Sequence, residues 1–177
     1  MKRLFNVGLL AVALICGNAC NSQDKAEDKS KRASPPAKVS EKIKSGATIT
    51  IDYGQPSVKG RTIGKDVEPM DGKVWRTGAN EATVFETDKE LSVQDGRLPA
   101  GKYGLFTVFN GNDVTVIFNK TANQWGAFKY SEADDALRIK TKASDESAPS
   151  EKLTFKIDPS GLITLLWGAK KVEFSVK

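Results

Sequence analysis

Residues 152–157 read Lys-Leu-Thr-Phe-Lys-Ile, a stretch in which polar side chains alternate with large apolar ones. The same alternation occurs in Thr-Ile-Thr-Ile at 48–51 and in Val-Glu-Phe-Ser-Val at 172–176. Successive side chains of a β-strand point to opposite faces, so a period of two predicts strands with one packed face and one solvated face. Such strands are typical of antiparallel sheets.

Similar runs of β-branched and aromatic residues continue through 47–177, with turn-forming residues between them. Asp95-Gly96, Asn110-Gly111-Asn112 and Pro159-Ser160-Gly161 are hairpin candidates, because their residue types suit tight turns. The strands that we expect are 47–53, 82–87, 102–109, 113–119, 124–130, 136–142, 152–157, 162–167 and 171–176. About nine strands with no long helical period predict an all-β fold, either an antiparallel β-sandwich or a partly closed barrel.

One long segment, residues 54–80, interrupts these strands with many Gly and Pro residues and few aliphatic ones. We expect a long ordered loop, and such loops often form binding sites. Aromatic, guanidinium, amide and carboxylate groups gather in and beside it, and these groups suit a polar small molecule. The ligand-binding candidates are Tyr53, Arg61, Trp75, Arg76, Asn80 and Glu81. Alternatively, these side chains hold the loop together by bonding its backbone groups.

The N-terminus has the layout of a bacterial secretory signal, because two basic residues precede an apolar run at 7–15 and then small residues. That run is far shorter than the ~20 residues that a membrane-spanning helix needs. We expect residues 1–19 to be a signal peptide. Cys20 follows Ala19 as in lipoprotein attachment sites, so we expect a lipid on Cys20. Gly17 stands where an aliphatic residue is usual, and the alternative is ordinary cleavage to a soluble protein.

Residues 20–46 are rich in charge, Ser and Ala and nearly free of aliphatic side chains. Such a composition buries too little apolar surface to offset the entropy of ordering, so we expect a disordered tether that begins at the lipid-attachment cysteine. The folded domain is then expected at 47–177. This domain has no cysteine, because Cys16 and Cys20 both lie upstream of it.

The charges exclude several classes of function. Residues 1–46 carry nine basic and four acidic side chains and so account for the net charge of +5, whereas 47–177 carries 18 of each sign. A nucleic-acid-binding domain would be basic in its folded part, so no nucleic-acid partner is expected. The chain has no His, which excludes His-based catalysis and His-bound metals. We expect no cofactor and no metal.

Several motifs resemble those of the domain of unknown function 2911 family. The resemblance lies in residues 53–61 (Tyr-Gly-Gln-Pro-Ser-Val-Lys-Gly-Arg), 74–83 (Val-Trp-Arg-Thr-Gly-Ala-Asn-Glu-Ala-Thr), 98–106 (Leu-Pro-Ala-Gly-Lys-Tyr-Gly-Leu-Phe), 125–128 (Trp-Gly-Ala-Phe) and Tyr130. The resemblance covers nearly all of 47–177. It implies secreted or lipid-anchored proteins of Gram-negative envelopes, and it implies no activity or ligand.

We therefore expect a non-enzymatic binding or interaction module in the cell envelope of a Gram-negative bacterium, anchored to a membrane through Cys20. Its partner would be a small molecule, a glycan or an envelope protein. One alternative is a carboxylate-dependent hydrolase of envelope or extracellular glycans, with Glu81 as the candidate acid. The other alternative is a purely structural partner of another envelope protein.

Overall fold

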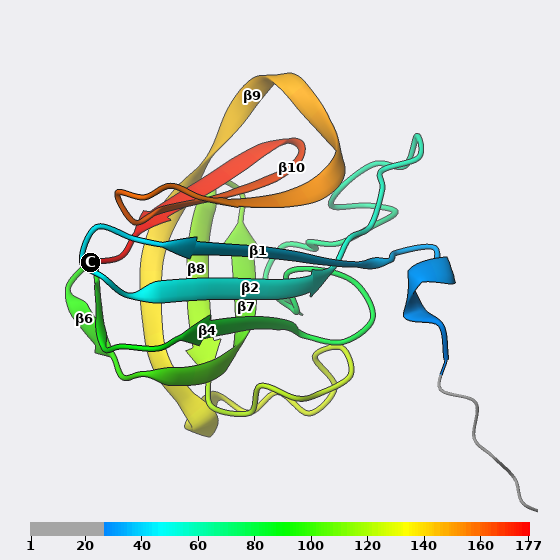
Figure 1. Cartoon of the computed structure of the whole chain (residues 1–177). Helices are drawn as coiled ribbons and strands as arrows, with labels where there is room; N and C mark the ends of the chain where they lie inside the picture. The colour runs from blue at the N-terminus through cyan, green and yellow to red at the C-terminus, as the bar shows by residue number, and fades with distance from the viewer. Residues whose placement is uncertain (1–26) are drawn as a thin grey trace, which may run out of the picture.

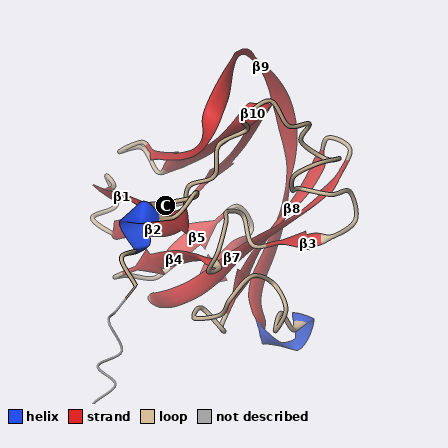
Figure 2. Cartoon of the chain, turned by 90° about the vertical axis from the view of Figure 1, so that its right-hand side faces the viewer, coloured by secondary structure: helices blue, strands red, loops and turns tan. Residues whose placement is uncertain are grey.

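The computed structural model describes residues 27–177, and strands make up most of its regular structure (Figures 1 and 2). Two single-turn 3₁₀ helices, η1 and η2, span Lys29–Lys31 and Glu132–Asp134. The strands are β1 (Pro36–Lys42), β2 (Thr48–Gly54), β3 (Val74–Trp75), β4 (Thr83–Thr87), β5 (Leu91–Val93), β6 (Gly96–Leu98), β7 (Gly101–Asn110), β8 (Asp113–Asn119), β9 (Asp135–Ile157) and β10 (Leu162–Ser175). The predicted all-β class is confirmed.

One antiparallel sheet with the order β1-β2-β4-β7-β8-β9-β10 forms the body of the domain. β3 pairs with the part of β7 that extends past Thr83, the first residue of β4. The sheet curls into a half-barrel, and the long β9 bends over its top together with β10 (Figure 1). Two sets of backbone hydrogen bonds hold the curl. Leu153 donates to Pro56 beside β2, and Ser92 of the β5–β6 hairpin exchanges hydrogen bonds with Lys177 at the C-terminus.

The core lies inside this curl. Ile49 and Ile51 of β2 are fully buried, as are Leu153 of β9 and Ile163 of β10. The residues on either side of each along the strand are less buried. The alternation at 48–51 and 152–157 therefore marks the inward face as predicted. Each such side chain contributes about 1.5–3 kcal/mol through burial.

The predicted boundary at residue 47 is wrong, because β1 lies within the predicted tether. β1 pairs with β2 along its whole length, Val39 packs against the core and Ile43 is buried. As an edge strand β1 has one neighbour, and its inward positions hold Ala37, Val39 and Glu41, which give a weak apolar pattern. Residues 36–46 are therefore part of the folded domain. The predicted signal peptide and Cys20 lie outside the described residues.

The predicted strand at 124–130 is also wrong. These residues form a loop that covers the outer face of β7 and β8, where Ala127 and Tyr130 pack against a second cluster of Ala82, Phe106 and Ile117. The aromatic content of this segment therefore reflects packing on a sheet from outside. Within residues 27–177, no helix is long and apolar enough to cross a membrane.

The four strands predicted at the C-terminal end merge into two. Residues 136–142 and 152–157 both belong to β9, and 162–167 and 171–176 fall largely in β10. The polar stretch 143–151 within β9 shows no apolar alternation, yet its Asp145 faces Lys170 of β10 across the ladder. The short strands β5 and β6 were missed, although Asp95-Gly96 correctly marked their turn.

Removal of β1 should destabilise the domain. A chain beginning at Ser45 loses the β1–β2 ladder and the burial of Ile43, which alone contributes about 1.5–3 kcal/mol. We expect a lower melting temperature, measured by circular dichroism, than for a chain beginning at Glu27, which keeps every contact described above. Equal melting temperatures for the two chains would show that β1 adds nothing to the fold.

Candidate functional site

The turn between β3 and β4, which includes residues 76–80, has an unusual backbone. Thr77 and Asn80 have φ angles of 53° and 63°, in the left-handed region that β-branched residues such as Thr rarely enter. Buried hydrogen bonds fix this conformation, since the Thr77 hydroxyl meets that of Thr107 at 3.1 Å and Thr83 Oγ1 donates to the Thr77 carbonyl at 2.9 Å. Strained conformations that neighbours enforce in this way cluster at functional sites.

This turn packs backbone to backbone against the end of β2. The Ala79 amide donates to the Gly54 carbonyl at 3.2 Å. A Cβ atom at position 54 would lie 2.1 Å from the Ala79 carbonyl oxygen, so only glycine fits there. The contact brings the Tyr53-Gly54 motif and the 75–81 motif together, although 20 residues separate them in the sequence.

A cavity of about 410 Å³ lies between this turn, the long loop and β10. We call it the Arg76 cavity. Its charged lining residues are Arg61, Asp66, Glu68 and Arg76, and its indole walls come from Trp75 and Trp167. Both indoles are almost fully buried, and their Nε1 atoms donate to the carbonyls of Gly78 (3.1 Å) and Glu68 (2.8 Å). The walls are therefore rigid.

Arg76 is the exceptional residue of the cavity. Its side chain is half-buried, and its Nε is buried without a hydrogen-bond partner within the described residues. Burial lowers the pKa of the guanidinium, and the nearby Glu68 carboxylate opposes this shift. An arginine nevertheless remains charged at neutral pH. The cavity therefore holds a cationic side chain whose Nε donor has no partner within residues 27–177.

Other candidates at this cavity have structural roles. Arg61 donates to the carbonyls of Ser57 (2.6 Å) and Val58 (3.0 Å), and so closes the start of the long loop. The Asn80 side chain donates to the carbonyl of Ser34 at 2.9 Å. For Arg61 the alternative that the sequence left open, bonding of loop backbone groups, describes the contacts that are made. Asn80 instead ties the turn to the residues before β1.

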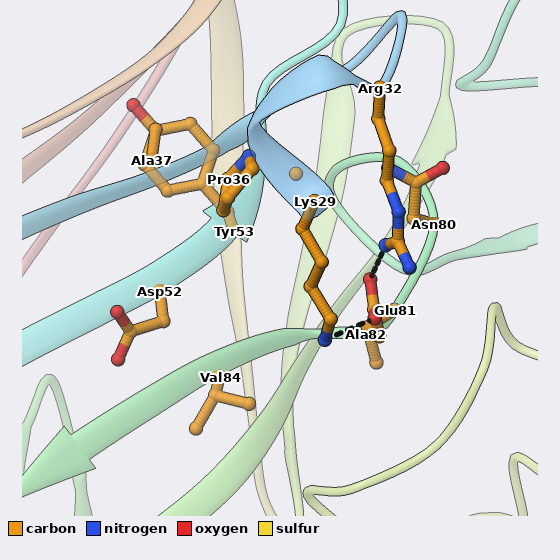
Figure 3. Close-up of a pocket in the computed structure, with 11 residues that line it drawn as sticks. Lys29, Arg32, Pro36, Ala37, Asp52, Tyr53, Asn80, Glu81, Ala82 and Val84 are labelled. Atoms are coloured by element: carbon orange, nitrogen blue, oxygen red, sulfur yellow. Dashed lines mark hydrogen bonds and ion pairs between the residues drawn. The ribbon is translucent and has the colours of Figure 1, made fainter. Parts of the chain in front are cut away.

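Glu81 points to the other side of the turn, into a smaller hollow of about 170 Å³ (Figure 3). Its two carboxylate oxygens accept hydrogen bonds from Lys29 (2.7 Å) and Arg32 (2.8 Å), and Arg32 also pairs with Glu27. Tyr53 lines this hollow but is mainly a core residue, with its ring edge-on to Phe155. The ion pairs tie residues 27–32 to the domain, so we call this stretch the N-terminal segment.

The charges around Glu81 disfavour a role as general acid. The hydrogen bond from Lys29 is the largest influence on the Glu81 carboxyl and holds its pKa below the ordinary value of 4.5. A glycosidase acid needs the opposite shift, because it must keep its proton near neutral pH. Glu81 therefore acts as a charged acceptor that holds Lys29 and Arg32.

The structure thus divides the six predicted residues between two sides of one turn. Arg61, Trp75 and Arg76 line the Arg76 cavity, Tyr53 and Glu81 line the hollow, and Asn80 lines both. Sequence reasoning missed Lys29 and Arg32 as lining residues, because they lie in the predicted tether. It had no signal for the place of Trp167 at the cavity, since β10 is distant in sequence from the long loop.

A comparison with protein-family models matches residues 34–176 to the family described as "Protein of unknown function (DUF2911)". The match begins before β1, in agreement with the corrected domain boundary. No curated protein and no solved structure that was compared with the chain matches it.

Replacement of Glu81 should release the N-terminal segment. In Glu81→Gln both ion pairs lose their charge, so we expect trypsin to cut after Lys29, Lys31 and Arg32 several-fold faster at neutral pH. The melting temperature should change little, because the pairs are partly exposed. Glu86→Gln is the matched control, because Glu86 is similarly exposed and pairs with Lys102 away from the segment.

The stabilisation that the same ion pairs provide should decrease at low pH. Because the pKa of Glu81 is lowered in the folded chain, the stabilisation from these ion pairs is fully present above pH 4.5 and is lost as the pH falls through the lowered pKa.

Unchanged trypsin cleavage in Glu81→Gln at neutral pH would mean that other contacts hold the N-terminal segment.

Proposed function

We propose that the chain, which belongs to the DUF2911 family, is an exported, membrane-anchored binding module that holds a small anionic ligand in the Arg76 cavity. The observation that carries this proposal is the half-buried Arg76 guanidinium, whose Nε has no partner within residues 27–177. The family membership assigns no ligand, so the chemistry of the cavity is the basis for the ligand class.

The energetic argument starts from the cost of Arg76. A buried polar group without a hydrogen bond and a partly buried cation both disfavour folding. A ligand that supplies the missing acceptor and a counter-charge would offset this free-energy cost. A guanidinium presents its donors in a planar fork that suits a carboxylate or a phosphate.

The other lining groups narrow the ligand class. Asp66 and Glu68 place carboxylate groups at the same cavity, where they can accept hydrogen bonds from hydroxyl or ammonium groups. The indole walls supply apolar surface that excludes water from one side. The volume of about 410 Å³ falls within the range of small-molecule sites, about 300–1,000 Å³. An acidic sugar or an amino acid combines an anion with such groups.

Export and anchoring are supported by the N-terminal sequence. Lys2 and Arg3 precede the apolar run, and Ala19 precedes Cys20, as expected for a lipoprotein signal. The family resemblance implies the same location. We therefore propose that the module binds its ligand in the envelope, with Cys20 carrying the lipid.

Substitution of Arg76 should remove ligand binding with little change in stability. In Arg76→Met the buried Nε disappears and no described partner is orphaned, so the free energy of unfolding should fall by no more than about 1 kcal/mol, or rise. In the wild type, glucuronate, glutamate or inorganic phosphate should raise the melting temperature. A bound ligand at about 100 times its Kd stabilises by about 2.7 kcal/mol.

Arg97→Met is the matched control, because Arg97 is a highly exposed arginine on β6 that pairs with Glu90 far from the cavity. It should keep the ligand-dependent shift. A large fall in the melting temperature of Arg76→Met, with no ligand-dependent shift in the wild type, would instead identify Arg76 as a structural residue.

Replacement of Cys20 by Ser should move the mature protein from the membrane fraction to the soluble periplasmic fraction, because the thiol that carries the lipid is then absent. Cell fractionation followed by immunoblotting measures the distribution. Membrane association that is the same for Cys20→Ser and the wild type would rule out lipid anchoring at this residue.

A further inference from the structure

Two large apolar side chains stand out on the described surface. Trp125 is 55% exposed and Phe128 is 86% exposed, whereas the other two tryptophans are only 2% and 3% exposed. Both exposed residues lie in one loop, residues 120–131, between β8 and η2. We call this stretch the aromatic loop. Two large exposed apolar side chains in one short loop distinguish this part of the described surface.

Backbone hydrogen bonds and the packing of Ala127 hold the aromatic loop against the domain. The Gly126 amide donates to the Asn80 carbonyl at 3.0 Å, and Gln124 accepts from the Ala82 amide at 2.9 Å. Ala127 packs inward against the Phe106 cluster. The indole and the phenyl ring are therefore presented on a backbone that these contacts hold in place.

The aromatic loop lies beside the N-terminal segment. The Arg32 guanidinium carbon is 5.7 Å from the centre of the Trp125 ring, and the same guanidinium pairs with Glu81. Six residues separate Cys20 from Glu27, so this connection spans at most about 25 Å when fully extended. A lipid on Cys20 would therefore keep the aromatic loop close to the membrane surface.

We infer that the aromatic loop docks on the lipid bilayer that carries the anchor, with Trp125 and Phe128 inserted at the interface. This inference rests on the proposed lipid at Cys20. Tryptophan favours the interface because its ring is apolar and its N–H remains hydrated. Lys120 and Lys129 are exposed in the same loop and suit anionic head groups. A lipid chain commonly needs such a second contact for stable attachment.

A glycan is the competing occupant, because sugars also stack on exposed indoles. The contacts favour the bilayer. Arg32 already lies over the Trp125 ring, and Phe128 is the more exposed of the two aromatic residues although it offers no polar group to a sugar. Insertion of apolar rings requires only an apolar phase beneath the head groups.

The test uses the mature chain, residues 20–177, whose single thiol is Cys20 because Cys16 lies in the predicted signal. Coupling Cys20 to a maleimide lipid in vesicles of phosphatidylethanolamine and phosphatidylglycerol reproduces the anchor. Because Trp75 and Trp167 are buried, a change in tryptophan emission reports Trp125. We expect a shift to shorter wavelength and quenching by brominated acyl chains.

Three variants make the result specific. Phe128→Ser keeps the reporter but removes one of the two exposed rings, so the shift should become smaller. Trp125→Phe should abolish the shift, which assigns the signal to that indole. Asp95→Asn is a control in the exposed turn that precedes β6 and should leave the shift unchanged. β6 lies on the opposite side of the domain from the N-terminal segment (Figure 1).

Unchanged and unquenched emission of the coupled wild type would overturn the docking. The chemical anchor does not depend on lipidation in the cell, so this failure is distinguishable from a failure of Cys20→Ser to change fractionation. A shift caused by a soluble oligosaccharide such as maltohexaose, with none caused by coupling to vesicles, would also overturn the docking and identify a sugar-binding surface.

Discussion

The contact between Gly54 and Ala79 is the constraint on which both sides of the candidate site depend. No side chain fits between the two backbones, so the end of β2 and the turn before β4 lie in direct contact. The turn then has little freedom, because Thr77 is held in a left-handed conformation by buried hydroxyl groups. Arg76 and Glu81 consequently point to opposite sides of one rigid turn.

Charge is distributed unevenly around this turn. On the Glu81 side each carboxylate oxygen has a cationic partner, and the pKa of Glu81 is lowered as a result. On the Arg76 side the guanidinium lies near Glu68, and its Nε has no partner within residues 27–177. Satisfied charges are expected in a scaffold, whereas an unsatisfied buried donor in a walled cavity is expected where a ligand completes the site.

Arg32 connects the candidate site to the rest of the surface. It pairs with Glu27 and Glu81 and lies over the Trp125 ring, so the N-terminal segment, the turn and the aromatic loop meet at one guanidinium. Hydrogen bonds with Glu27 and Glu81 raise the pKa of Arg32, so this connection stays charged. The segment nearest to the proposed anchor is thus packed against the proposed membrane-contacting loop.

The sequence by itself determined the all-β class, the three tight turns and the inward face of β2 and of the C-terminal parts of β9 and β10, because a strand's period of two is a local property. It also selected Arg76, since a guanidinium in a long Gly-rich loop is conspicuous. Only the tertiary structure decided that Arg76 is unpartnered and Arg61 is not, and that β1 belongs to the domain. Those facts depend on contacts between residues far apart in the chain, and an edge strand with a weak pattern becomes ordered only when β2 supplies its hydrogen bonds.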